Sequence, residues 1–408
     1  MEEWKEYKLG DVCTIFGRIG FRGYTTDDLT NDPNQGAISL SPTNIVQGEI
    51  DLSKPTFIKW DKYYESPEIM VYTNDIVLVK TGSSIGRTAI IRELKHPITL
   101  NPQLVVLKDI KINSYYLSYL IKSYLFQAQL KSITVGSAIP TLSQKNLANL
   151  KICVPDLTLQ NKTASILKSL DDKIENNRKI NENLEQQAQA LFKSWFVDFE
   201  PFRDQPFVES ELGMIPEGWR VEELGKLIET TSGGTPSRKI DNYYNNGSIY
   251  WVKSKELLDN FIINTEEKIT DVAIKESSAK LFPSHSVLIA MYGATVGAIG
   301  ITTKSMACNQ AICALLPNQL LPYTFLYLFA KFSKIYLQNK AVGSAQQNIS
   351  QIIIKSLKVS YNSNAIKRFN SIVEPLLTII EKNAFESHCL SHLRDTLLPK
   401  LMSGEITL

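Results

Sequence analysis

The chain carries the same series of motifs twice, and this duplication limits the folds that it can adopt. Trp4 returns as Trp219, the glycine motif GSSIG at residues 82–86 returns as GATVG at 293–297, and VGSA at 135–138 is repeated at 342–345. The motifs keep their order, and the copies lie about 210 residues apart. A repeat of that length has the size of a domain, not of a solenoid unit, so two similar domains are predicted.

Composition narrows the class of protein. The 408 residues are 43% hydrophobic, which is enough for real cores, and the net charge is only +2. A nucleic-acid surface would therefore have to be a local basic patch. The five cysteines are odd in number and form no Cys-x-x-Cys pair, so they are expected to be reduced core thiols. The first residues lack a basic, then apolar, leader, and no apolar run has membrane-spanning length, so a cytoplasmic protein is expected.

Each repeat is predicted to divide into a mixed α/β part and a helical part. Residues 75–80 have the pattern of a strand and residues 115–130 that of an amphipathic helix. From residue 159 to 196 there is neither Gly nor Pro, whereas the stretch that follows has the Pro and Gly content of a linker. The predicted segments are a mixed domain at 1–155, a helix at 156–200, a linker at 201–215, a second mixed domain at 216–360 and a second helix at 361–408.

Both helical parts show a sustained heptad pattern, which favours a coiled-coil seam over an amphipathic surface helix. An asparagine interrupts the apolar series at the same place in each copy, and a polar residue there fixes register at a cost in stability. Ordinary core helices that tolerate an asparagine remain the alternative. The predicted pairing or docking residues are Leu170, Ile174, Asn177, Leu184, Leu191, Trp195, Leu376, Ile380, Asn383, Leu390 and Leu397.

Two such helices would act as a ruler, because they would set a fixed distance between the mixed domains. A helix of about 35 residues is about 50 Å long, and an antiparallel pair would hold the mixed domains apart, although parallel pairing stays possible. Two like domains related by an approximate two-fold axis suit duplex DNA, one turn of which spans about 35 Å. The expected class is thus α+β, with a pseudo-two-fold internal repeat.

Catalytic motifs are not recognisable. The glycine motif at 82–86 has three residues between its glycines and is followed by Arg87 where a phosphate-binding loop needs lysine. Residues 101–104 (NPQL) do not match the tetrapeptide of adenine methyltransferases, and Glu266-Glu267-Lys268 lacks the upstream carboxylate of a nuclease. The glycines are expected to form a tight turn after a strand. Whether that turn contacts DNA phosphates or is purely structural is left open.

Polar and basic residues near predicted turns are the DNA-contact candidates, because Arg and Lys suit guanine and phosphate while Gln suits adenine. Tyr243, Tyr244, Tyr250 and Trp251 interleave with the second group and are candidates to line a groove. The predicted DNA-binding residues are Arg18, Arg22, Lys80, Ser83, Ser84, Arg87, Ser137 and Lys145 in the first repeat, and Arg238, Lys239, Lys253, Lys255, Tyr292, Thr295, Ser344, Gln346 and Gln347 in the second.

Three long motifs resemble those of type I restriction–modification specificity (S) subunits. Residues 210–219 (SELGMIPEGW) resemble the start of the second half of that family, residues 187–199 the end of its central helix and residues 393–406 its C-terminus. The resemblance implies two target recognition domains that each read half of a bipartite DNA site, with two antiparallel helices between them. It also implies two methyltransferase (M) subunits and restriction (R) subunits as partners. These partners, and not this chain, would bind S-adenosylmethionine, ATP and magnesium.

Two other classes remain as alternatives. One is a duplicated DNA-modifying or DNA-cleaving enzyme whose active site is not recognised, which would turn over DNA without partners. The other is a coiled-coil scaffold without DNA contact, which would show none of the salt-dependent affinity that phosphate contacts produce.

Overall fold

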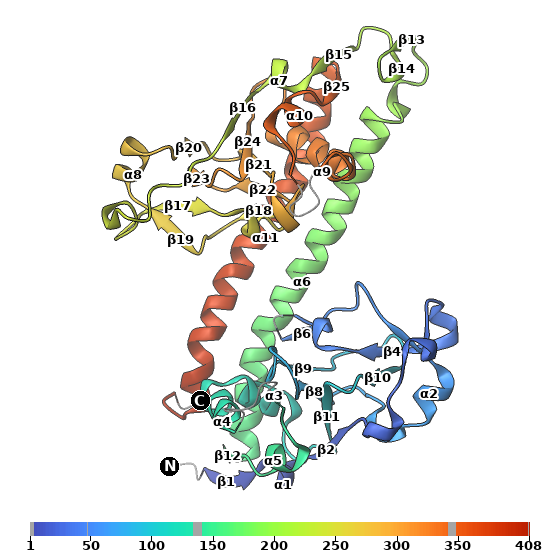
Figure 1. The fold of residues 1–408 in the computed structure, drawn as a ribbon, viewed down its shortest axis with the longest axis vertical. Coiled ribbons are helices and arrows are strands. Elements are labelled where there is room, and N and C mark those ends of the chain that lie inside the picture. Colours follow the sequence, from blue (N-terminus) through green and yellow to red (C-terminus); the bar gives the residue numbers. More distant parts are fainter. Residues whose placement is uncertain (1–3, 47, 134–140, 342–347, 407) are drawn as a thin grey trace. The chain divides into compact units, whose positions relative to one another are not determined.

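The computed structural model describes residues 4–46, 48–133, 141–341, 348–406 and 408. The chain forms two compact units: residues 1–172 with 390–408, and residues 173–389. Each unit holds one mixed domain and segments of both long helices, α6 (Leu157–Phe196) and α11 (Ser363–Met402) (Figure 1). The prediction of two similar mixed α/β domains with two long helices is confirmed.

The first unit is built on two four-stranded sheets. The antiparallel sheet is fully buried at its centre because β8 and most of β11 consist of β-branched and leucine residues. Its order is β2 (Thr14–Gly17), β11 (Leu104–Lys108), β8 (Ile76–Val79) and β9 (Thr88–Ile90). The second sheet is mixed, in the order β10 (Ile98–Leu100), β4 (Gly36–Leu40), β7 (Phe57–Lys59) and β3 (Leu29–Thr30).

Short elements complete this unit. Strand β1 pairs with β12, and β5 pairs with β6. The helix expected at 115–130 is broken, because Ser123 is extended and caps a new helix with its side chain. The bounds are β1 (Lys5–Lys8), β5 (Ile45–Val46), β6 (Glu49–Ile50), β12 (Lys151–Val154), α1 (Leu9–Val12), α2 (Trp60–Tyr64), α3 (Ser114–Lys122), α4 (Tyr124–Ser132) and α5 (Gln144–Ala148).

The second unit repeats this plan. Its sheet β16-β24-β21-β22-β18 corresponds to β2-β11-β8-β9 with one added strand, and β15 pairs with β25 as β1 pairs with β12. A single helix, α9, stands where α3 and α4 stand in the first repeat. The bounds are β15 (Arg220–Glu223), β16 (Glu229–Ser232), β17 (Ile249–Val252), β18 (Asn260–Ile262), β19 (Glu267–Ile269), β20 (Leu281–Phe282), β21 (Val287–Ala290), β22 (Ile299–Thr302), β23 (Met306–Cys308), β24 (Ile312–Leu316), β25 (Lys358–Tyr361), α7 (Leu224–Leu227), α8 (Asp271–Glu276), α9 (Tyr323–Asn339) and α10 (Gln351–Lys355).

The segment at 201–215, expected to be a linker, is an ordered part of the second unit. Strands β13 (Phe207–Ser210) and β14 (Gly213–Pro216) form a hairpin there. Ile215 of β14 and Phe202, which precedes the hairpin, are buried, and the Phe202 ring packs on Trp195 of α6 and on Trp219. Aromatic burial against the end of α6 therefore orders a stretch whose Pro and Gly content alone suggested a linker.

Helices α6 and α11 pair in antiparallel sense through the predicted seam. In the second unit, Asn177 is fully buried and its Nδ2 donates to Ser387 Oγ at 3.3 Å, while Asn383 Nδ2 donates to Asn181 Oδ1 at 2.8 Å. Leu184, Leu191, Trp195, Leu376 and Ile380 belong to or pack against the apolar core of that unit. In the first unit, Asp171 of α6 accepts from Arg394 of α11 at 2.8 Å, and Leu397 packs against the core. Leu170, Ile174 and Leu390 are half-buried along the same helices.

The expectation that all the cysteines are core thiols is wrong for two of the five. Cys13, Cys308 and Cys313 are buried, and burial raises the pKa of Cys13 and of Cys313 to about 12. Cys153 and Cys389 are exposed, because β12 and α11 turn these positions outward. Among the described residues, no helix combines the length and apolar composition needed to cross a membrane.

Candidate nucleic-acid interface

A tight glycine turn follows the central buried strand of the first unit. Gly82 and Gly86 adopt φ angles of 100° and 86°, which side chains with a Cβ rarely tolerate. The turn closes through Ile85 N–H to Gly82 C=O (3.2 Å) and through Gly86 N–H to Val79 C=O (2.9 Å). Residues 82–87 are the first glycine turn. It presents Ser83 and Arg87 to solvent at the end of a rigid strand.

The second unit builds the same turn at residues 293–298, the second glycine turn. Gly293 and Gly297 have φ angles of 75° and 79°. Val296 N–H donates to Gly293 C=O at 3.1 Å, and Gly297 N–H donates to Ala290 C=O at 2.9 Å. Every one of these contacts has its counterpart in the first turn, so the two turns share one backbone frame.

The elements around each turn also match. An isolated bridge joins Thr81 to Thr141 in the first unit, and another joins Tyr292 to Asn348 in the second. Lys80 N–H donates to Gln103 C=O as Met291 N–H donates to Ala311 C=O, each at 2.8 Å. The first glycine turn therefore lies beside the stretch before α5 and beside the turn that enters β11. The second lies beside the stretch before α10 and beside the turn that enters β24.

On this common frame the side chains differ. Lys80, Arg87 and Gln103 of the first unit correspond to Met291, Ala298 and Ala311 of the second. Burial lowers the pKa of the Lys80 ammonium, and among the described residues no carboxylate opposes that shift. Arg87 and Gln103 are exposed. The first glycine turn and its neighbours thus offer cationic and amide donors suited to phosphate and base edges, whereas the second turn offers Tyr292, Thr295 and the Gln310 amide without the two cations.

Some of the predicted contact residues lie elsewhere. The prediction for Arg18 fails on burial: the side chain is 4% exposed, and it donates to Leu100 C=O (3.0 Å), Arg22 C=O (3.2 Å) and Thr99 Oγ1 (3.2 Å). Burial lowers the pKa of its guanidinium. Arg22 donates to Glu65 C=O and lies 3.7 Å from a Glu68 carboxylate oxygen. Both arginines hold the first mixed domain together.

The basic residues predicted in the second repeat meet acidic partners. Arg238 pairs with Glu267 at 2.6 Å and stacks on Tyr244, Lys255 pairs with Glu266 at 2.7 Å, and Lys253 reaches both carboxylates. The hydrogen bond from Lys253 lowers the pKa of Glu267. Tyr243 and Trp251 are buried in the core beneath this cluster, and Tyr250 is half-buried against another part of the core. DNA phosphate would have to displace these carboxylates, so this cluster is a weaker candidate than the glycine turns.

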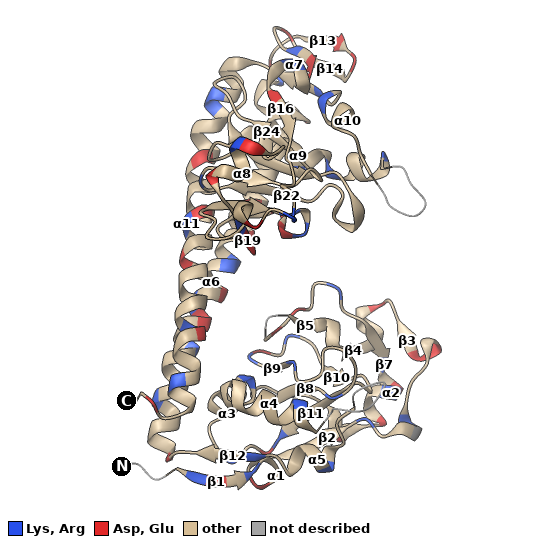
Figure 2. Cartoon of the chain, turned by 60° about the vertical axis from the view of Figure 1, so that its left-hand side comes forward, with Lys and Arg blue, Asp and Glu red and all other residues tan. Residues whose placement is uncertain are grey.

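The remaining predicted residues are either exposed or undescribed. Lys145 on α5 and Lys239 are exposed, while Ser84 is half-buried in the first glycine turn. Ser137, Ser344, Gln346 and Gln347 lie outside the described residues. Gln103 was not among the predicted residues, because its place beside the first glycine turn depends on the Lys80 N–H to Gln103 C=O bond between residues far apart in sequence. Figure 2 shows both basic and acidic residues along the long helices.

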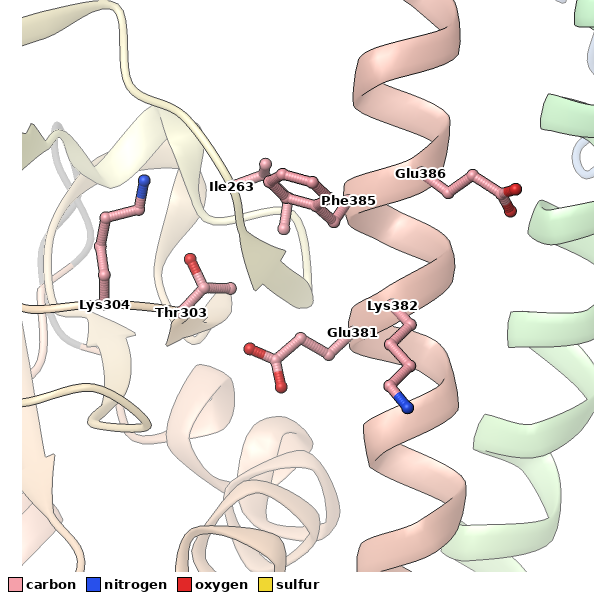
Figure 3. Close-up of a pocket in the computed structure, with 7 residues that line it drawn as sticks. All are labelled: Ile263, Thr303, Lys304, Glu381, Lys382, Phe385 and Glu386. Atoms are coloured by element: carbon pink, nitrogen blue, oxygen red, sulfur yellow. The ribbon is translucent and has the colours of Figure 1, made fainter.

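A hollow in the second unit offers no comparable frame. It lies between the turn after β22 and helix α11, and its lining comprises Ile263, Thr303, Lys304, Glu381, Lys382, Phe385 and Glu386 (Figure 3). Glu381 and Phe385 point into it, whereas Glu386 points toward α6 and accepts from Asn177 at 2.7 Å. Among the described residues no group of three or more His, Cys, Asp or Glu is arranged to hold a metal ion.

Comparison with known proteins identifies the family. Residues 1–186 and 216–391 match the type I restriction modification DNA specificity domain. The specificity subunit of the type I restriction enzyme MjaIX from Methanocaldococcus jannaschii is 32% identical over 99% of this chain and 94% of that protein. The HindI specificity subunit from Haemophilus influenzae is 26% identical over the whole of both chains.

A solved structure supports the same fold. The type I restriction–modification S subunit from M. genitalium aligns with a TM-score of 0.61 at 15% identity, over 98% of this chain and 96% of that one. Because the family matches both repeats and its members align along the full length, the chain belongs to the family of type I restriction–modification DNA specificity subunits.

Proposed function

We propose that each mixed domain reads one half of a bipartite, asymmetric DNA target, and that the glycine turns lie at the two reading surfaces. The observation that carries this proposal is the shared turn frame with different outward side chains. Equal frames place the two domains on DNA in the same way, and unequal side chains select different bases. An asymmetric target follows, because Met291 and Ala298 of the second repeat stand where the first repeat has Lys80 and Arg87.

The proposed partners carry the chemistry. Two M subunits would dock on the paired helices and methylate adenine with S-adenosylmethionine, and R subunits would add ATP- and magnesium-dependent cleavage. Support comes from the names of the relatives, which are specificity subunits of type I restriction enzymes. The continuous helices α6 and α11 supply long surfaces for docking outside the seam. In this proposal the chain itself is not catalytic.

A self-sufficient enzyme is the competing function. Incubating the purified full chain alone with DNA and either S-adenosylmethionine or magnesium distinguishes the two, since our proposal expects neither methylation nor cleavage above a protein-free control. Turnover by the chain alone would favour the duplicated enzyme. A scaffold without DNA contact predicts no salt-dependent DNA binding even when the M subunit is present.

Exchange of one mixed domain tests the modular division of the target. Residues 1–155 are replaced by the corresponding residues of a relative, and adenine methylation is mapped across the genome of a host that supplies the M subunits. We expect one half of the methylated sequence to change and the other half and the spacer to persist. A change in both halves would contradict separate reading by the two domains.

A further inference from the structure

One glutamine side chain hydrogen-bonds to the backbone of each glycine turn. Gln127 of α4 donates through Nε2 to Gly86 C=O at 3.1 Å and to Ile121 C=O at 2.8 Å. Gln338 of α9 donates through Nε2 to Val296 C=O at 3.2 Å. The two glutamines are separated by the same number of residues as the glycine motifs themselves. The glutamines therefore occupy equivalent positions of the duplication, although Gln127 bonds to the carbonyl of Gly86 and Gln338 bonds to that of Val296, one position earlier in its turn.

The second glycine of each turn makes room for this contact. A Cβ at Gly86 would lie 2.5 Å from Gln127 Oε1, and a Cβ at Gly297 would lie 3.2 Å from Gln338 Cγ. The positive φ angle favours glycine at both positions, and an added Cβ would press on the glutamine side chain. The glutamine and the glycine form one structural unit in each repeat.

We infer that Gln127 and Gln338 are positioning residues for DNA recognition, each holding its glycine turn in the conformation that meets DNA. This inference rests on the proposed function. The Nε2 group of each glutamine donates to a carbonyl of its turn, so we assign it to holding the turn and not to reading a base. A turn fixed before binding discriminates better between sequences, because DNA need not supply the free energy of ordering it.

The two glutamines differ in how firmly each one holds its turn. Gln127 is half-buried and bridges the turn to the carbonyl left free where α3 ends, whereas Gln338 is exposed and makes one bond. Half-site discrimination is the ratio of the affinity for the correct duplex to the affinity for a duplex altered in one half. Removing the amide should lower this ratio about ten-fold for the half read by the first domain and about three-fold for the other half, since one such bond is worth about a factor of two to ten.

The test uses Gln127→Met and Gln338→Met, because methionine keeps the length of the side chain and lacks its donor. Gln129→Met is the matched control, since Gln129 lies on α4 as well but donates to Lys151 C=O, away from the turn. Each full-length variant is assembled with the host's M subunits, and affinity is measured for the methylated sequence and for duplexes altered in one half. Thermal unfolding shows whether each variant is folded.

We expect Gln127→Met and Gln338→Met to weaken discrimination in different halves of the target, with the other half unchanged and each variant still folded at the temperature of the binding assay. Gln129→Met should change discrimination in neither half. Retained discrimination in both glutamine variants, or an equal loss in Gln129→Met, would overturn the inference. Because Gln338 is exposed, its variant decides the matter if Gln127→Met does not fold. Absence of half-site discrimination in the unaltered protein would instead overturn the proposed function, and this inference with it.

Discussion

Two arginines of the first domain show how environment sets the role of a side chain. Arg18 uses its guanidinium inside the domain, where it joins the loop after β2 to the end of β10 and stacks over Tyr24 at 5.3 Å. Arg87 stands exposed on the first glycine turn. An arginine whose N–H groups donate to buried acceptors supports the fold, whereas an exposed arginine keeps its charge available for a phosphate.

We expect Arg18→Met to lower the free energy of unfolding by about 2 kcal/mol or more, because it leaves the Leu100 carbonyl and the Thr99 hydroxyl buried without their donor. Arg87→Ala should stay within about 0.5 kcal/mol of the unaltered protein, as surface substitutions usually do. Denaturant unfolding measures both. Salt-dependent DNA binding should fall in Arg87→Ala, and equal stability of the two variants would contradict these roles.

At the scale of elements, the helix pair combines apolar contact with a polar layer. Asn177 meets Ser387 and Asn383 meets Asn181, and each bond is the repeat-equivalent of the other. Asn177 Nδ2 also donates to Glu386, which lowers the pKa of that carboxyl. Because a polar pair in a seam is satisfied in one alignment only, this layer selects the register of α6 against α11.

Leu184 tests the seam beside this layer. Leu184→Asp places a carboxylate against the apolar core of the second unit and should cost about 3 kcal/mol, because a charge there has no partner. Gln186→Asp adds the same charge to an exposed position two residues away and should cost little. Thermal unfolding followed by helical circular dichroism compares the two. Equal midpoints would show that Leu184 does not contribute to the pairing.

At the scale of the whole molecule, the duplication separates what is shared from what differs. Both repeats keep the strand, the glycine turn and the supporting glutamine, while the outward side chains change. The helices repeat as well, each with 40 residues. Under the proposed function, the repeated parts set position and spacing, and the divergent side chains set the bases that are read.

A matched insertion tests the helices as a ruler. One heptad is added within residues 173–193 of α6 and one at the equivalent place in α11, so that the seam keeps its phase. The helices lengthen by about 10 Å, and the unread spacer should grow by about three base pairs while both half-sequences persist. Methylation mapping measures the outcome. Altered half-sequences with an unchanged spacer would refute the ruler.

The sequence by itself determined the repeat, the two mixed domains, the long helices and the seam positions, because each depends on local pattern and spacing. Leu184 and Asn177 were predictable since a heptad shows which helix positions face a partner. The glycine turns were predictable for a similar reason, since a buried strand precedes them and few residues accept their φ angles.

Only the tertiary structure decided which polar groups remain available. Arg18 donates to the Leu100 carbonyl and the Thr99 hydroxyl, both more than eighty positions away. Arg238, Lys253 and Lys255 pair with Glu266 and Glu267 on another part of the chain. The stretch expected to be a linker packs on α6 through the rings of Phe202 and Trp195. The polar contacts join residues that are distant along the chain, and no local pattern encodes them. Whether a charged side chain is available to contact DNA therefore depends on the residues that lie next to it in the fold.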